Sequence, residues 1–136
     1  MKATNLILLF VFLASATIAD DSASQKRGEQ AAQSWLELVD EGDFRASWRE
    51  AASPFKKQIP EAHWANTIAA AREPFGPLVS RSLQKSVYET TLPGVPDGEY
   101  VVMTFAAEYE NKATATEVVT SMLDGSEWRV AGYYIR

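Results

Sequence analysis

The chain has 136 residues, with 13 lysines and arginines against 18 aspartates and glutamates, which gives a formal net charge of −5. Because the charges are spread along the sequence without a basic block, we expect no nucleic-acid partner and no long-range attraction to anionic lipid headgroups. The absence of cysteine excludes disulfide bonds, a lipoprotein thioether anchor and thiol catalysis, so the folded domain depends on its hydrophobic core.

The N-terminus has the pattern of a secretory signal peptide. Lys2 gives a positive start, residues 6–13 form an unbroken apolar run, and small residues follow up to Ala19. A membrane-spanning helix needs about 20 apolar residues, which favours a cleaved leader over an uncleaved anchor. We therefore predict a signal peptide over residues 1–19, cleaved after Ala19 or alternatively after Ala16. The mature protein is expected in the periplasm or the extracellular space, with no stable membrane span.

The first half of the mature chain is predicted to be helical. After a flexible segment over residues 20–26, apolar residues at helical spacing indicate an amphipathic helix from about Arg27 to Asp40. Gly42 suits the left-handed position that ends a helix. Asp43 suits the N-cap of a second helix, because its side chain can accept a hydrogen bond from an unpaired backbone amide.

Three tryptophans fall on the inner faces of the predicted helices: Trp35 on the first, Trp48 on the second, and Trp64 on a third that has Pro60 in its first turn. The simplest interpretation is that these large rings tie the helices to one another and to a sheet. The alternative is an aromatic cage for a ligand.

The second half has the composition of β-strands, with many valines, threonines and tyrosines and with turn residues at strand-like intervals. Strands are predicted over residues 79–91, 99–110, 113–123 and 127–136, the first of them bulged. Short turns between consecutive strands favour an antiparallel meander, and helices must cover one of its faces. We therefore predict a single α+β domain over residues 27–136, with N-terminal helices packed on a curved four-stranded antiparallel meander.

Several phrases of the sequence together resemble a known bacterial family. They include residues 35–44, the Pro-Gly loop Leu92–Val102 and the ending Trp128–Arg136. The resemblance is to the family called domain of unknown function 4019, and it implies a bacterial source and export to the cell envelope. It brings no catalytic residues. The architecture is also similar to the cystatin-like and nuclear-transport-factor-like cone folds, which host many functions.

No catalytic or metal-binding motif stands out in the sequence. His63 is the only histidine, so a two-histidine metal site cannot form, and no Gly-x-Ser-x-Gly elbow is present. The acidic cluster over residues 40–43 has too few oxygen ligands for calcium. We predict no catalytic residue, no metal ligand and no cofactor.

A small acid–base enzyme of the cone-fold type, an isomerase or dehydratase, remains the alternative. Such an enzyme needs a buried carboxylate facing an interior tyrosine. Strand alternation places Tyr133 and Tyr134 on opposite faces, so one of them points inward. The candidate carboxylates are Asp40, Glu99, Glu108 and Glu117, and the candidate donors are Tyr100, Tyr109, Tyr133 and Tyr134.

The preferred hypothesis is a non-enzymatic exported module that binds a small apolar ligand or an envelope protein, and homodimerisation through the exposed sheet face is a further possibility. Two interpretations are open for Arg81, Arg129 and Arg136. Each is either a solvated side chain or a guanidinium group that binds an anionic ligand at two points. If aromatic rings fill the space between helices and sheet, interaction through the outer sheet face gains support over ligand binding. The candidate pocket or face residues are Trp35, Trp48, Trp64, Arg81, Phe105 and Tyr133.

Overall fold

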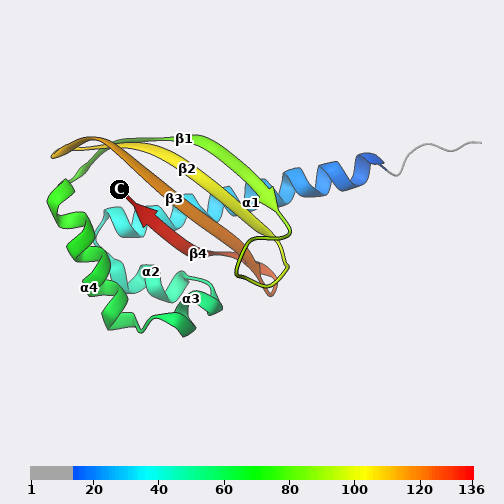
Figure 1. Cartoon of the computed structure of the whole chain (residues 1–136), viewed down its shortest axis with the longest axis horizontal. Coiled ribbons are helices and arrows are strands. Elements are labelled where there is room, and N and C mark those ends of the chain that lie inside the picture. Colours follow the sequence, from blue (N-terminus) through cyan, green and yellow to red (C-terminus); the bar gives the residue numbers. More distant parts are fainter. Residues whose placement is uncertain (1–13) are drawn as a thin grey trace, which may run out of the picture.

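The computed structural model describes residues 14–136 and has an α+β architecture, as predicted. The helices are α1 (Ala14–Asp40), α2 (Phe44–Glu50), α3 (Ser53–Gln58) and α4 (Glu61–Arg72), followed by a short 3₁₀ turn, η1 (Glu73–Phe75). The strands are β1 (Leu78–Glu89), β2 (Tyr100–Tyr109), β3 (Lys112–Asp124) and β4 (Glu127–Ile135). They form one antiparallel sheet in the order β1-β2-β3-β4, and α1 crosses this sheet and contacts all four strands (Figure 1). The finer likeness to cone folds stays a prediction.

The first helix begins earlier than the sequence pattern indicated. We expected a flexible segment over residues 20–26, but the structure includes it in α1. Two polar side chains there reach the sheet: Ser24 Oγ donates to Glu99 Oε1 at 3.3 Å, and Gln25 Nε2 donates to the backbone carbonyl of Ser86 at 3.1 Å. These tertiary hydrogen bonds hold a polar segment against the sheet as part of the helix. The spacing of apolar residues, from which the helix was predicted, gives no sign of such bonds.

Most of the predicted leader lies outside the residues that the structure describes. Residues 1–13 are not described, and Ala16 and Ala19 lie in α1. Cleavage after either residue stays a prediction. Among the described helices, none combines the length and the apolar character that a membrane crossing requires.

A glycine allows α1 to approach the sheet closely. A Cβ atom at Gly28 would lie 2.5 Å from Cγ2 of Val101, which is closer than side-chain carbons can pack. The hydroxyl of Ser121 on β3 donates to the Gly28 carbonyl at 2.8 Å. This contact fixes the position of α1 along the sheet.

The turn and the cap that follow α1 are as the sequence predicted. Gly42 adopts a φ of 80°, and the Asp43 side chain accepts a hydrogen bond from the backbone amide of Ala46 at 3.3 Å. Pro60 is the N-cap residue of α4 rather than a member of its first turn.

The sheet buries one face against the helices and has irregular pairing at its β1 edge. Register shifts occur within the β1–β2 pair, which confirms the predicted bulge. Alternate residues of β2 are buried, as predicted: Val101, Met103, Phe105, Ala107 and Tyr109. The main core cluster comprises Ala32, Trp35, Leu36, Val39, Trp64, Ile68, Val101, Met103, Phe105, Val119 and Val130.

The tryptophans join the helices to one another through hydrogen bonds as well as packing. Trp35 Nε1 donates to the carbonyl of Ser47 at 2.8 Å, and Trp64 Nε1 donates to the Ser47 hydroxyl at 3.0 Å. Trp48 Nε1 donates to the carbonyl of Ile59 at 2.7 Å. The indole N–H groups of these three tryptophans are therefore paired, as an interior tryptophan requires.

Candidate functional site: a buried ionic network

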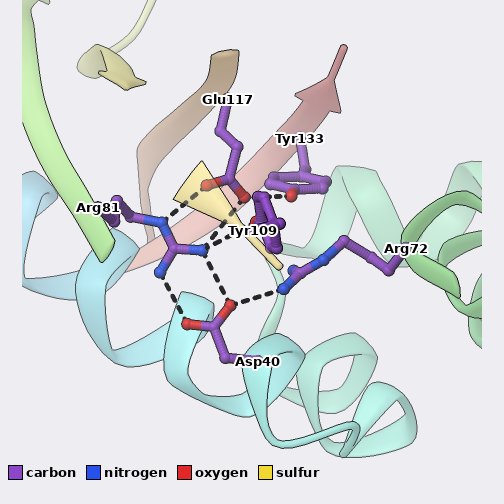
Figure 2. A network of polar contacts seen from close by, with 6 residues as sticks. All are labelled: Asp40, Arg72, Arg81, Tyr109, Glu117 and Tyr133. Atoms are coloured by element: carbon purple, nitrogen blue, oxygen red, sulfur yellow. Dashed lines mark hydrogen bonds and ion pairs between the residues drawn. The ribbon is translucent and has the colours of Figure 1, made fainter. Parts of the chain in front are cut away.

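Six polar side chains meet where the ends of two helices reach the buried face of the sheet (Figure 2). Two helices and all four strands each supply one member of this ionic network. Its members are Asp40 from α1, Arg72 from α4, Arg81 from β1, Tyr109 from β2, Glu117 from β3 and Tyr133 from β4.

Arg81 lies at the centre of the ionic network and binds both carboxylates with its guanidinium fork. Its Nε donates to Glu117 Oε1 at 2.7 Å and its Nη2 to Glu117 Oε2 at 3.2 Å. Its Nη1 donates to Asp40 Oδ2 at 2.7 Å and its Nη2 to Asp40 Oδ1 at 2.9 Å. Such two-point pairs are among the strongest hydrogen bonds in proteins.

Asp40 is the last residue of α1, where the partial negative charge of the helix terminus disfavours a carboxylate. Two arginines offset this effect, since Arg72 Nη2 also donates to Asp40 Oδ1 at 2.9 Å. Burial alone would raise the pKa of Asp40, but the hydrogen bonds from Arg81 and Arg72 outweigh it and hold this pKa below its usual value. Asp40 is therefore ionised at neutral pH.

Glu117 has no exposed surface, and it faces an interior tyrosine. The Tyr133 hydroxyl donates to Glu117 Oε2. Burial, together with the negative charge of Glu117, raises the pKa of Tyr133 well above its usual value. Burial and the same carboxylate raise the pKa of Tyr109 to about 12. Both tyrosines are therefore neutral at physiological pH, and Tyr133 serves as a hydrogen-bond donor to Glu117.

The charges of the ionic network balance, because two carboxylates face two guanidinium groups. Arg72 is 9% exposed, and its guanidinium carbon lies 4.8 Å from the centre of the Tyr109 ring. Its Nε and Nη1 are buried without a hydrogen-bond partner. The ionic network thus joins six elements with balanced charges, while two donors of Arg72 stay unpaired among the described residues.

Two open grooves flank the ionic network and reach three of its members, but not Glu117 or Tyr133. One, of about 290 Å³, is lined by Asp40 and Arg72 among others. The other, of about 270 Å³, is lined by Arg81 and Phe105 among others. Neither is lined by Glu117 or Tyr133, so the carboxylate–tyrosine pair faces side chains rather than a ligand-sized space.

The structure brings several of the predicted site residues together in the interior. Trp35 packs against Trp64 at 5.9 Å and against Tyr133 at 5.3 Å between ring centres. Phe105 is 3% exposed, and Trp48 packs at the edge of the same core. Arg81 binds internal carboxylates, where the sequence allowed either a solvated side chain or a ligand-binding fork.

The remaining candidates lie apart from the ionic network. Glu99 accepts a hydrogen bond from the Tyr88 hydroxyl at 2.9 Å, while Glu108 and His63 are exposed. Tyr134 is 53% exposed, so Tyr133 is the inward member of that pair, as strand alternation required.

Three other candidates also make local contacts away from the ionic network. The Tyr100 hydroxyl donates to the Pro96 carbonyl, and the side chains of Arg129 and Glu127 pair at the surface. The guanidinium of Arg136 lies over the Tyr134 ring. In the described part of the chain, no three His, Cys, Asp or Glu side chains are grouped to hold a metal ion.

The sequence reasoning missed Arg72. It lies four residues after Ile68, which itself lies four residues after Trp64, so an arginine occupies the buried face of α4. An arginine on such a face needs a carboxylate partner. Glu117 carries a similar signal, because it alternates with the buried residues Ala115 and Val119 on β3.

The family model described as a protein of unknown function, DUF4019, matches residues 31–133. The chain belongs to the DUF4019 family. All six residues of the ionic network fall inside the matched range of this DUF4019 protein, whereas Ser24, Gln25 and Gly28, which attach the start of α1 to the sheet, precede it. No curated protein matches the chain.

Proposed function

We propose that this DUF4019 protein is an exported, non-enzymatic binding or protein-interaction module of the bacterial cell envelope. The observation that carries the proposal is the closed state of the ionic network, in which both carboxylates are bonded by arginine or tyrosine donors. A general acid or base must reach a substrate proton at hydrogen-bond distance. Glu117 and Tyr133 bond one another and line neither groove, and Asp40 is held by two arginines, so these groups do not offer that access.

Export is supported by the leader pattern, and it has a direct test. Protein recovered from a periplasmic extract is expected to begin at Asp20, or at Thr17 in the alternative of cleavage after Ala16, when its N-terminus is sequenced. A mature protein that retains Met1 would remove the export part of the proposal.

Binding is tested by native mass spectrometry of the protein isolated from the envelope of its own host. A second species at constant stoichiometry, either a protein subunit or a small molecule, is expected. A bare monomer at all concentrations would count against a binding role, and a pure homodimer would favour pairing of two copies through the outer sheet face.

The contact between Glu117 and Tyr133 favours a second candidate, the small acid–base enzyme. This alternative requires that small carbonyl compounds reach the pair. A library of such fragments, screened by the NMR signals of Tyr133, distinguishes the two. Shifts centred on Tyr133 would favour the enzyme, and their absence would favour the binding module.

A further inference from the structure

We infer that the groove between α1 and the free edge of β4 binds an extended peptide segment of a partner protein, which adds to the sheet beside Trp128. The inference rests on the proposed binding function and names the site and the class of partner. The groove has a volume of about 550 Å³, within the range of known ligand sites. Ser34 of α1 and Trp128 of β4 lie on its two walls.

The outer edge of β4 is covered at one residue and open at another. β3 and β4 join through a tight turn at Gly125 and Ser126, with Asp124 opposite Glu127. In an antiparallel pair, alternate residues direct their backbone N–H and carbonyl toward the partner strand or away from it. The Val130 carbonyl points away from β3, because it accepts the backbone N–H of Ala52 at 2.8 Å.

The same alternation applies to Trp128, two residues earlier on β4. It therefore presents its backbone N–H and carbonyl on the outer edge, on the side of Ala52. Among the backbone hydrogen bonds between the described segments, none reaches Trp128. The segment at Ala52 thus covers the β4 edge at Val130 and leaves an open donor and acceptor at Trp128. An added strand satisfies such groups, and this is a common mode of peptide recognition.

The walls of the groove combine the aromatic ring of Trp128 with polar side chains. The Trp128 ring is half-buried, and its Cε3 atom lies 3.3 Å from the position of a Cβ at Gly28, so the ring packs against α1. A packed aromatic side chain with a polar rim is typical of protein interaction surfaces. A smaller groove of about 160 Å³ shares Ala31, Ser34, Glu127 and Trp128 and continues toward Val130, which extends the surface along the strand.

The groove between α1 and β4 is lined by three charged side chains, Arg27, Glu99 and Glu127. Two acidic groups of the rim are already bonded within the protein: Glu127 by Arg129 at 2.7 Å and Glu99 by Tyr88 at 2.9 Å. Arg27 on α1 is exposed and has no ion pair within residues 14–136 as the structure describes them. The hydrogen bond from the neutral Tyr88 hydroxyl leaves Glu99 negatively charged, so the groove carries charges of both signs. Arg27 is the cation among its lining residues, and the expected partner segment carries an acidic side chain opposite it.

The test uses a display library of random 12-residue peptides selected on the purified mature protein. Enriched peptides are expected to carry an acidic residue and to protect the backbone amide of Trp128 from hydrogen exchange. Ser34→Trp, which fills the groove from an exposed helix position, should weaken their binding at least tenfold. The matched control, Gln33→Trp on the other side of the same helix, should bind them as the wild type does.

Three results would overturn the assignment: no enrichment over background, equal binding to Ser34→Trp, or protection of strands other than β4. Arg27→Glu gives a second measurement and should weaken binding of the acidic peptides in the same direction. If native mass spectra show a second subunit that Ser34→Trp retains, the proposed binding function stands and the groove assignment fails. If the second species is absent from the wild type as well, the proposed function fails independently.

Discussion

Removing Arg81 is expected to destabilise the protein strongly, because it leaves an uncompensated negative charge in the interior. Arg81→Met deletes four hydrogen bonds to Asp40 and Glu117, of 2.7 to 3.2 Å, and Glu117 is fully buried. Breaking a buried ion pair by removing one partner costs about 3–5 kcal/mol of unfolding free energy. Arg81 and Asp40 keep 12% and 18% of their side chains exposed, so we expect the lower end, about 3 kcal/mol.

Urea unfolding followed by tryptophan fluorescence measures this effect, since Trp35 and Trp64 pack in the adjoining core. With an m-value of about 2 kcal/mol per molar urea, the midpoint should fall by about 1.5 M. Arg129→Met is the matched control, because Arg129 pairs with exposed glutamates at the surface. The free energy of unfolding of Arg129→Met should fall by no more than about 1 kcal/mol.

A double variant separates the loss of charge balance from the loss of packing. Arg81→Met combined with Glu117→Gln removes one charge of each sign and keeps an acceptor for the Tyr133 hydroxyl. It should be more stable than Arg81→Met alone by about 1 kcal/mol or more, which a double-mutant cycle measures. The reasoning is refuted if Arg81→Met and Arg129→Met lose the same stability, or if the double variant is no more stable than Arg81→Met.

Four further predictions follow from particular contacts. Gly28→Ala should lower the free energy of unfolding by about 1–3 kcal/mol, because the new methyl group overpacks against Val101. Adding Val101→Ala should recover part of this loss in the same urea assay. An unchanged urea midpoint for Gly28→Ala would contradict the close approach of α1 to β2. Asp43→Ala should cost about 1 kcal/mol by loss of the helix cap, measured by thermal unfolding, with no loss arguing against the cap. Folding lowers the pKa of Asp40 from 3.8. The ionised Asp40 therefore stabilises the folded state above pH 3.8, and this stabilisation is lost as pH falls through the folded-state pKa. When the free energy of unfolding is measured at decreasing pH, Asp40→Asn should show a shallower decline than the wild type. Folding raises the pKa of Tyr109 from 10.0 to about 12, so the free energy of unfolding falls as pH rises through this range. Tyr109→Phe should reduce this fall. Identical pH profiles of stability for the variant and the wild type above pH 10 would contradict the raised pKa.

Much of the fold could be predicted because local rules and burial agree in this sequence. The alternation of Val101, Met103 and Phe105 marked the buried face of β2, and Gly42 and Asp43 marked the turn after α1. The start of α1 could not be predicted in this way. Residues 20–26 of this helix are mostly polar, and the side chains of Ser24 and Gln25 bond Glu99 and Ser86, which are far away in the sequence.

The candidate site was harder to predict, because its members are single residues on six different elements. Asp40, Glu117, Tyr109 and Tyr133 were candidates for acid–base chemistry, yet their sequence positions did not indicate which would meet. Arg72 was missed, although its spacing from Trp64 and Ile68 placed it on the buried face of α4.

The sequence by itself determined the class of protein: an α+β domain without cysteine, with helices on one face of a meander and no motif for metal or nucleophilic catalysis. These properties follow from composition, periodicity and turn chemistry, which act over a few neighbouring residues. Only the tertiary structure decided that two arginines and two carboxylates neutralise one another inside the core, and that the β4 edge stays open at Trp128. Charge pairing and edge cover depend on distances between residues tens of positions apart, and packing alone sets those distances.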